Sequence, residues 1–547
     1  MGERVQGGRL VARAIAAHGV DTIFTLSGGH VMPIYEGCRH EGVRLLDVRH
    51  EQAAAHAAEA WGRIRRACGV AVVTAGPGVT GTLTAVANSC VAQTPVVVVG
   101  GARPLVQAEQ GALQELDQLS LFKPITKWAA VCTHADRIPD LVATAFRHAL
   151  AQPRGPVYLE VPMDVLFDEA PAPDEIKPSR TEGRPFGDPR ELMKASDLLN
   201  HAERPAVVAG SGIWWDGAWK QLRSLAMNGR LPVYLNGSGR GALPPEHELF
   251  FQHSRQTALA AADVVCVVGT PLDFRLRFGR FGGGNGSKLV HIHSDPTELG
   301  RNRTPDAAIV GDCAAVLGIL ADAVKAPARP AGRTEWLGRL RESEDAWWNE
   351  HRAEIESDAS PLNHYRLGAE LDRVLDPGTI VIGDGGDVVA AASRVLRVHR
   401  PGHWLDPGPF GCLGVGPPYA LGVKAAEPSK QVVVIAGDGA FGLNGFEFET
   451  LTRFGLPAVF VIGNDAAWGE IRIPQIGIYG QEGEVATKLA PTPYHRLVEA
   501  FGGHAEHVER PVDLAPALER ALEAGKPAIV NVMLDPDAMA GHPYRGM

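Results

Sequence analysis

The stretch that most constrains this chain runs from residue 437 to residue 469. It follows the apolar run Val432–Ala436, which predicts a buried strand because a continuous block of aliphatic residues suits a strand covered on both faces. The triplet Gly437-Asp438-Gly439 then predicts a sharp turn at the carboxyl end of that strand. The Asp438 carboxylate is therefore expected at a strand-to-helix junction, which is where open α/β sheets bind their ligands.

A second carboxylate follows one helix and one strand later. A helix is predicted over Phe446–Phe454, and the apolar run Ala458–Ile462 predicts a strand that ends in Asn464-Asp465. Two parallel strands joined by one right-handed crossover end at the same edge of a sheet. Asp438 and Asp465 are therefore expected to converge.

Converging carboxylates at this edge predict a metal-bound diphosphate. Hard oxygen ligands suit Mg²⁺, which usually completes its coordination shell with phosphate oxygens when the protein supplies few ligands. The backbone amides of Ala440 and Phe441, at the start of a helix, would add binding to an anion.

Length and composition set the class of protein. The 547 residues suffice for about three domains, and 45% hydrophobic with 21% charged residues is typical of globular chains. The net charge of −10 argues against nonspecific binding to nucleic acid or a membrane surface. The seven scattered cysteines lack CxxC spacing, no apolar run is long enough for a membrane span, and the first residues resemble an amphipathic helix more than a signal peptide. A cytoplasmic protein is expected.

Strand and helix signals alternate in three blocks, which we expect to be domains over 1–170, 188–325 and 355–534, followed by a tail over 535–547. Linkers are predicted near 171–188 and 326–333, where proline and charge accumulate. The predicted strands are Thr22–Leu26, Leu45–Val48, Val70–Thr74, Pro95–Gly100 and Val157–Val161; Ala206–Ala209, Pro232–Leu235, Val264–Gly269 and Lys288–Ile292; and Thr379–Ile382, Val432–Ala436, Ala458–Ile462 and Ala528–Val532. This alternation predicts an α/β fold of three doubly wound parallel sheets.

The stretch from Gly437 to Gly469 resembles the thiamine diphosphate (ThDP) enzymes of the acetolactate synthase-like type, whose motif is GDG followed by two asparagines one helix and one strand later. The resemblance implies metal ligands at Asp438, Asp465 and the Ala467 carbonyl, with Asn464 as an alternative, and cofactor contacts at Gly437, Gly439, Ala440 and Phe441. One position departs from the family: its second asparagine is Asp465 here, which keeps an oxygen ligand and adds a negative charge.

The resemblance covers nearly the whole chain and implies pyrimidine-binding, middle and diphosphate-binding domains in that order. In this family the cofactor lies between the first domain of one subunit and the third domain of another. A homodimer is then the minimum assembly, and a homotetramer is common.

Glu51 is the catalytic residue that the resemblance implies most directly. By position alone it would be an acid at a helix start, favoured there by the helix dipole. Its surroundings, DVRHEQAAAHAAEAWGR, resemble the family's glutamate motif, in which a buried carboxylate bonds the aminopyrimidine and so activates the thiazolium.

Further cofactor contacts are implied by match. In the loop Gly408–Gly414, the Gly411 carbonyl would accept from the cofactor's amino group and Leu413 would lie between its rings; Leu413 could also be ordinary core. Gly386 and Asp387 would lie against the diphosphate, although by composition they are only part of a glycine turn.

A substrate-facing group is implied at Gly29, His30 and Gln114. Their surroundings resemble benzaldehyde lyase and the 2-hydroxyacyl-CoA lyases, where a histidine lies over the thiazolium and a glutamine reaches the substrate oxygen; Trp468 matches with them. The alternatives are a hydrogen-bonded histidine without a catalytic role and a solvated loop amide. His30 and Gln114 are expected to stabilise the alkoxide that forms on the substrate and to transfer its proton.

The middle domain would decide the substrate, since relatives use its cleft for FAD, for the ADP part of coenzyme A, or for nothing. Gly210 and Ser211 after a strand, with Arg275 and Arg277, could hold phosphates, and Asp295 could accept a ribose hydroxyl; a solvated basic face with a routine turn is the alternative. Arg545 lies in the tail, which is either a lid or a frayed terminus.

The function implied is a ThDP- and Mg²⁺-dependent lyase that cleaves a 2-hydroxyacyl-CoA to an aldehyde or ketone plus formyl-CoA. The alternatives are a benzaldehyde lyase-type acyloin lyase or carboligase without coenzyme A, an acetolactate synthase, and a non-catalytic subunit of the same fold. Neither nucleic acid nor membrane is expected as a partner.

Overall fold

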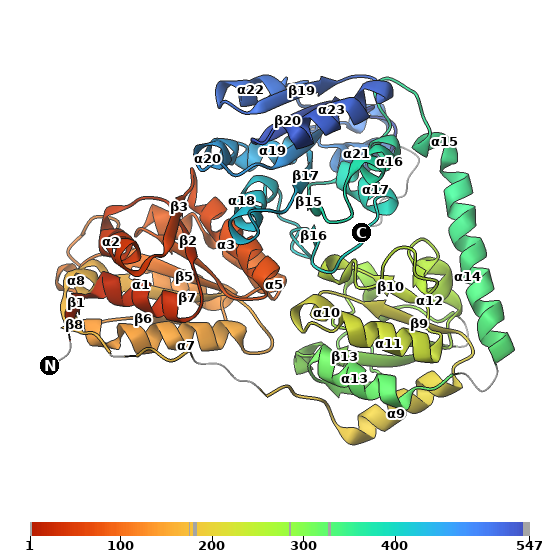
Figure 1. Ribbon diagram of the computed structural model, residues 1–547, viewed down its shortest axis with the longest axis horizontal. Coiled ribbons are helices and arrows are strands. Elements are labelled where there is room, and N and C mark those ends of the chain that lie inside the picture. The colour runs from red at the N-terminus through yellow and green to blue at the C-terminus, as the bar shows by residue number, and fades with distance from the viewer. Residues whose placement is uncertain (1–2, 174, 179–182, 284–285, 327–329, 540–547) are drawn as a thin grey trace.

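The computed structural model describes residues 3–173, 175–178, 183–283, 286–326 and 330–539. It contains three six-stranded sheets and one two-stranded sheet. Figure 1 shows the first unit in red and orange at the left, the middle unit in yellow and green at the lower right, and the third unit in cyan and blue above them. Neighbouring strands in the six-stranded sheets are all parallel, and helices cover the sheets. The α/β class with three parallel sheets is confirmed.

The first unit has the strand order β3-β2-β4-β5-β7-β6. Its strands are β2 (Thr22–Thr25), β3 (Arg44–Asp47), β4 (Gly69–Val73), β5 (Val96–Ala102), β6 (Ala129–Val131) and β7 (Val157–Pro162), and its longer helices are α1 (Gly7–Ala17), α2 (Met32–Glu41), α3 (Glu51–Arg65), α5 (Leu83–Val91) and α7 (Ile138–Leu150). The edge strand β6 is short and half-buried, and the sequence analysis missed it although it lies in the apolar run Trp128–Cys132. A short antiparallel pair, β1 (Arg4–Gln6) with β8 (Glu169–Pro171), joins the two ends of the unit.

The third unit repeats this topology, with the order β16-β15-β17-β18-β20-β19. Its strands are β15 (Ile380–Asp384), β16 (Trp404–Leu405), β17 (Val432–Gly437), β18 (Val459–Asn464), β19 (His504–Val508) and β20 (Ala528–Met533), and its helices include α16 (His364–Val374), α17 (Asp387–Val395), α18 (Gly416–Ala426), α21 (Gly469–Tyr479) and α23 (Pro511–Glu523). In both units the second strand lies at one edge and the third strand pairs with the first. The sequence did not predict β16 and β19, which are edge strands.

The middle unit is wound differently, in the order β11-β10-β9-β12-β13-β14, which is the dinucleotide-binding order. Its strands are β9 (Pro205–Ala209), β10 (Val233–Leu235), β11 (Phe250–Phe251), β12 (Val264–Val268), β13 (Lys288–His293) and β14 (Ala307–Val310), and its helices include α9 (Pro189–His201), α11 (Trp219–Gly229), α12 (Arg255–Ala261) and α13 (Cys313–Ala323). The edge strands β11 and β14 were again not predicted.

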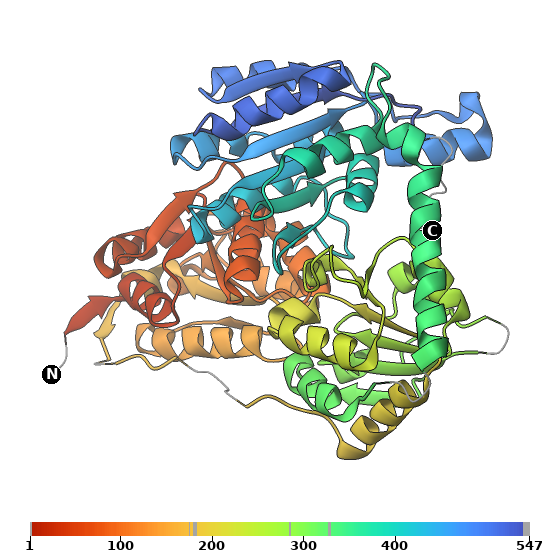
Figure 2. The same ribbon diagram turned by 45° about the vertical axis from the view of Figure 1, so that its right-hand side comes forward.

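The helix expected over Phe446–Phe454 is confirmed as α20 (Glu447–Arg453), but the sequence missed a separate short helix before it, α19 (Asp438–Asn444), because its glycines have low helix propensity. One sequence prediction was wrong. The linker expected over 326–333 contains the start of α14 (Pro330–Glu350), a 21-residue helix that runs beside the middle unit toward the third (Figure 2). Proline is well suited to the first helical position, so it did not mark a loop here. Arg333, within the predicted linker, is buried and donates to the carbonyls of Ala202 and Gly229.

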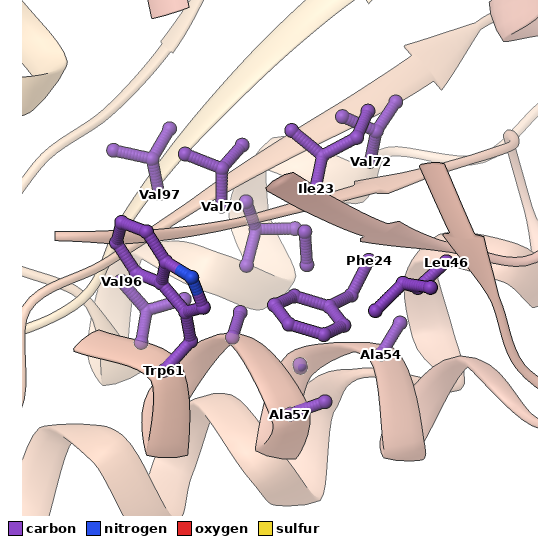
Figure 3. Close-up of a cluster of buried hydrophobic side chains, with 14 of the residues drawn as sticks. Ile23, Phe24, Leu46, Ala54, Ala57, Trp61, Val70, Val72, Val96 and Val97 are labelled. Atoms are coloured by element: carbon purple, nitrogen blue, oxygen red, sulfur yellow. The ribbon is translucent and has the colours of Figure 1, made fainter. Parts of the chain in front are cut away.

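Helix α3 connects the first unit to the third. One face of α3 places Ala54, Ala57 and Trp61 on the sheet, on the side of Phe24, Leu46 and Val96, whereas Val70, Val72 and Val97 lie on the other side of the strands (Figure 3). The small alanines let other elements approach closely, and a Cβ on Gly422 of α18 would collide with the backbone of Ala57. Figure 1 shows α18 beside α3. The helix that begins at Glu51 is therefore fixed on both sides.

Within the described residues, no helix combines the length and apolarity that crossing a membrane requires. All seven cysteines are free thiols, six of them buried.

Candidate active site

The first and third sheets carry their polar groups at the same topological point. In each, the winding reverses between the first and third strands, and ligands in doubly wound sheets bind beyond the carboxyl ends of such strands. Beyond β2 and β4, a Cβ on Gly28 would collide with the Thr74 side chain. Beyond β15 and β17, a Cβ on Gly385 would lie 2.8 Å from the Ala440 Cβ. Both reversals are therefore closely packed turns.

The structure brings Asp438 and Asp465 together at the end of the third sheet, and both are buried. Asp438 Oδ1 accepts from the Gly439 amide at 2.8 Å and Asp465 Oδ1 from the Ala467 amide at 3.1 Å. The Oδ2 atoms of both are buried and have no hydrogen-bond partner in the described part of the chain. Burial raises the pKa of Asp438 to about 6 and, with repulsion from Asp387 and Asp438, raises the pKa of Asp465 to about 8. Such oxygens fit a divalent cation, which would supply the opposite charge.

Asp387 and His364 extend this cluster. Asp387 is the first residue of α17, and its Oδ2 lies 3.7 Å from His364 Nε2. A Cβ on Gly469 would collide with Asp387 Oδ2 and would lie 2.7 Å from Asp465 Oδ2, so both oxygens face the same glycine. The sequence placed Asp387 near the cofactor but missed His364, because a single histidine at a helix start has no distinguishing spacing.

Trp468 and Ala467 belong to the turn after β18. The Trp468 ring lies against Gly439, where a Cβ would be 2.5 Å from it, and the Trp468 amide donates to the Thr487 carbonyl at 2.8 Å. Ala467 is buried beside Asp465 and pairs with Lys488 in an isolated bridge. This turn therefore places the proposed ligands Asp465 and Ala467 together with the indole.

The loop that contains Gly411 and Leu413 is fixed by a buried carboxylate that sequence reasoning missed. Asp384, the last residue of β15, accepts from the amides of Gly414 at 2.9 Å and Gly416 at 2.7 Å, and burial raises its pKa to about 6. Gly411 has φ +71° and nothing within 4 Å of the point where a Cβ would be, and Leu413 is half-buried. The loop is thus anchored at its end while Gly411 faces open space.

Glu51 is the first residue of α3 and lies against a glycine turn. The helix is capped by His50, whose Nδ1 accepts from the Gln52 amide at 3.0 Å. A Cβ on Gly81 would lie 3.1 Å from Glu51 Oε2, and one on Gly78 would lie 3.6 Å from Oε1. The two glycines therefore leave space for the carboxylate.

The backbone ahead of Glu51 is held by the third unit. Glu447 of α20, which sequence reasoning also missed, accepts from the amides of Arg49 at 2.8 Å and His50 at 3.1 Å. Glu447 is buried, and burial raises its pKa to about 7 against the opposing effect of its hydrogen bonds.

His30 lies in a cavity of about 490 Å³ at the reversal point of the first sheet. Its Nδ1 is 3.2 Å from Thr74 Oγ1, and burial lowers the pKa of its imidazole, which is therefore neutral at pH 7. None of the described residues that line the cavity is charged at that pH. The lining residues are Ser27, Gly28, Gly29, His30, Thr74, Pro104, Gln107, Leu113, Gln114 and Met163.

Gln114 is held in this cavity by a strained backbone. It has φ +59°, and a Cβ on the neighbouring Gly76 would lie 2.7 Å from the Gln114 Cβ. Gln114 Oε1 is buried and has no hydrogen-bond partner among the described residues. Gln118 fixes Gly76: its Oε1 accepts from the Gly76 amide at 2.6 Å, and its Nε2 donates to the Glu160 carboxylate at 2.9 Å. Sequence reasoning missed Gln118, although it lies in the same ALQELDQL stretch.

No hydrogen bond or ion pair among the described residues joins Glu51, His30 or Gln114 to Asp438 or Asp465. Glu51, His30 and Gln114 lie at the end of the first sheet, whereas Asp438 and Asp465 lie at the end of the third. Glu447 of the third unit reaches the segment before Glu51 only through the backbone amides of Arg49 and His50 in the described residues.

Of the residues predicted to bind a nucleotide in the middle unit, some are accessible and others are already engaged with neighbouring residues. Gly210 and Ser211 follow β9 at the point where this sheet reverses, and Arg277 is exposed. Arg275, however, already pairs with Asp273 at 2.6 Å, and Asp295 caps a turn by accepting from the Thr297 amide at 2.9 Å. Arg545 lies outside the described residues.

Three family profiles match the chain in the order of its three sheets. The Thiamine pyrophosphate enzyme N-terminal TPP binding domain matches residues 5–121, the central domain residues 192–320, and the C-terminal TPP binding domain residues 384–532. The chain belongs to the thiamine pyrophosphate enzyme family. Thiamine pyrophosphate is ThDP, so the resemblance in the GDG segment is confirmed.

Individual relatives of this ThDP enzyme carry two names. A Mycobacterium tuberculosis protein named acetolactate synthase large subunit IlvG is 41% identical over 98% of this chain and 96% of its own length. Human and zebrafish (Danio rerio) proteins named 2-hydroxyacyl-CoA lyase 2 are each 33% identical over 96% of this chain, and over 90% and 91% of their own lengths. The acetolactate synthase-like membership predicted from the sequence is therefore confirmed.

Proposed function

We propose that this ThDP enzyme is a Mg²⁺-dependent carbon–carbon lyase that cleaves a 2-hydroxyacyl-CoA to an aldehyde or ketone plus formyl-CoA, a reaction that also runs in reverse. The observation that carries the proposal is the cavity around His30. Cleavage beside a free hydroxyl needs a neutral base to accept the hydroxyl proton, and His30 is such a base. A 2-oxoacid would bring a carboxylate, for which the lining residues offer no lysine or arginine.

The residues of the third unit would hold the cofactor. Asp438, Asp465 and the Ala467 carbonyl would bind Mg²⁺ and through it the diphosphate. The buried, unpartnered oxygens of the two aspartates support this assignment. Gly437, Gly439, Ala440 and Phe441 begin the helix beside them, Gly386 lies on the facing turn, and Gly411, Leu413 and Trp468 are assigned to the organic part of the cofactor.

When bound, ThDP supplies a thiazolium that accepts the electron pair of the cleaved carbon–carbon bond. Glu51 would hold the proton that cofactor activation requires, in a position set by the N-terminus of α3. His30 would accept the hydroxyl proton of the substrate and return it to the product. Gln114 would orient the substrate oxygen, and its unpartnered Oε1 supports this role.

A coenzyme A site is proposed at the carboxyl edge of the middle sheet. The dinucleotide-type strand order supports it, since nucleotides bind where such sheets reverse, next to Gly210 and Ser211. Arg277 is exposed and is the better candidate for a phosphate contact, because Arg275 is already paired.

The separation of Glu51 from Asp438 supports assembly. We propose that the first unit of one subunit faces the third unit of another, so that the enzyme is at least a homodimer and also forms a tetramer. Sedimentation equilibrium of the ThDP-bound protein tests this, and a monomer with full activity would contradict it.

Acetolactate synthase activity is the second candidate, because the Mycobacterium relatives with 41% identity carry that name. Three parallel assays with ThDP and Mg²⁺ separate the candidates. A 2-hydroxyacyl-CoA should release formyl-CoA; benzoin cleavage alone would favour an acyloin lyase without coenzyme A; and conversion of pyruvate to acetolactate alone would overturn the lead proposal.

The variant Glu51→Gln tests the proton-holding role within the same assays. It should lower turnover at least about 100-fold, the scale of a lost acid–base group, while ThDP remains bound by calorimetry. Glu109→Gln, an exposed glutamate of the same unit, is the matched control. Full turnover in Glu51→Gln would exclude this role.

A further inference from the structure

His364 and Asp387 lie beside Asp465, one of the proposed ligands of the cofactor metal, and the cofactor metal requires neither of them. One ligand atom of each lies within 4.8 Å of the other two. The His364 Nε2 to Asp387 Oδ2 distance of 3.7 Å exceeds a hydrogen bond of about 2.9 Å, which leaves room between the two groups. Two opposite ligands of one cation, with bonds of about 2.1 Å, lie about 4.2 Å apart. Small side-chain rotations would therefore close all three groups on one ion.

The burial of these groups points to a ligand. Asp465 is 8% exposed and Asp438, next to it, is 1% exposed, and each has one carboxylate oxygen without a hydrogen-bond partner among the described residues. Asp387 Oδ2 is likewise buried and has no hydrogen bond to any residue that the structure describes. Among the described ion pairs, no lysine or arginine faces any of the three aspartates. Three carboxylates and a diphosphate carry more negative charge than one divalent cation balances.

Aspartate in place of asparagine at position 465 would allow one side chain to bind two cations. The family motif has asparagine there, and an asparagine amide has only one oxygen ligand. A carboxylate has two oxygens and can contact two cations. Asp465 Oδ2 faces Gly469 together with Asp387 Oδ2, on the His364 side of the cluster.

We propose that His364, Asp387 and Asp465 bind a second divalent cation, adjacent to the one assigned to Asp438, Asp465 and Ala467, with the Asp465 carboxylate shared. An imidazole nitrogen with two carboxylate oxygens favours a transition metal such as Mn²⁺ over Mg²⁺. This site goes beyond the proposed reaction, and only its adjacency to a cofactor metal rests on the proposed function.

The test uses the full-length protein and Mn²⁺ as the probe. Without ThDP and in excess Mg²⁺, the wild type should bind one Mn²⁺ per chain, and pulsed electron paramagnetic resonance should detect coupling to an imidazole ¹⁴N. His364→Asn should remove the nitrogen coupling and weaken Mn²⁺ binding at least about tenfold. His403→Asn, a half-buried histidine that contacts the Thr379 carbonyl at the opposite end of β15, should change neither result.

A second measurement adds ThDP and excess Mn²⁺, and two Mn²⁺ per chain are then expected. Absence of nitrogen coupling in the wild type, its persistence in His364→Asn, or a single Mn²⁺ per chain in protein shown by calorimetry to have bound ThDP would each overturn the second site. Failure to bind ThDP or to cleave substrate would instead count against the proposed function and would leave the Mn²⁺ titration without ThDP interpretable.

Discussion

The first and third units share one strand order and place their functional groups at the same reversal point, but the groups differ in chemistry. In the first unit, the polar side chains around the cavity are uncharged: His30 contacts Thr74, and Gln114 keeps a buried amide oxygen without a hydrogen-bond partner in the described part of the chain. In the third unit, the side chains with such an oxygen are carboxylates, those of Asp387, Asp438 and Asp465. The topology sets where a site forms, and the side chains decide whether that site suits an uncharged organic group or a cation.

The middle unit shows what a change of topology does. Its different strand order moves the reversal to Gly210 after β9 and Gly269 after β12. Its acidic residue Asp295 follows β13, the strand beside β12, and already caps a turn. Within the described residues, the group of side chains arranged to hold a metal lies in the third unit and not in the middle unit.

The comparison predicts that third-unit variants lose cofactor and first-unit variants lose turnover. The largest effect is expected for Asp438→Ala, because it removes a carboxylate whose Oδ2 is buried, has no hydrogen-bond partner among the described residues and is assigned to the cofactor metal. ThDP affinity in the presence of Mg²⁺, measured by calorimetry, should fall at least about 100-fold. Glu482→Gln, an exposed acid of the same unit, should leave the affinity unchanged. Unaltered ThDP binding in Asp438→Ala would contradict the assignment of cofactor binding to the third unit.

A smaller effect on a different quantity is expected for His30→Gln. Loss of a positioned base should lower kcat by about 100-fold while ThDP affinity stays at the wild-type value. His40→Gln, on the exposed end of α2, serves as the control. If His30→Gln weakened ThDP binding and kept its kcat, His30 would contribute to cofactor binding and not to catalysis, contrary to the proposal.

The smallest effect concerns Glu447, the carboxylate by which the third unit holds the backbone before Glu51. Burial raises its pKa from 4.5 to about 7, so the folded protein keeps a proton that the unfolded chain has already lost between these values. Stability contributed by this group therefore falls as pH rises from about 4.5 to about 7 and is constant above that range.

Glu447→Gln removes this titration and keeps an oxygen for the amides of Arg49 and His50. The melting temperature of the wild type minus that of the variant, measured with ThDP and Mg²⁺ bound, should decrease across this window. A difference that stays constant or increases with pH would show that Glu447 is already ionised in the folded protein at the lower pH values.

Much of the fold was predictable because buried parallel strands are continuous apolar runs. The central strands of all three sheets were found within a residue or two, whereas the edge strands β6, β11, β14, β16 and β19 were missed. The first four are only two to four residues long, at or below the shortest run that indicates a strand, and β19 is mostly polar. The short helix α19, which begins at Asp438, was missed because its glycines have low helix propensity, whereas α20 was found within one residue.

The sequence by itself determined the local chemistry: a carboxylate after each of two neighbouring strands, a glutamate at a helix start, and a histidine after a glycine pair. These follow from chain order, because a residue at the end of a parallel strand has a known position in the sheet. Only the tertiary structure decided which distant groups support them. Asp384, Gln118, Glu447 and His364 each act on residues that other elements carry, and no local pattern marks a contact across elements.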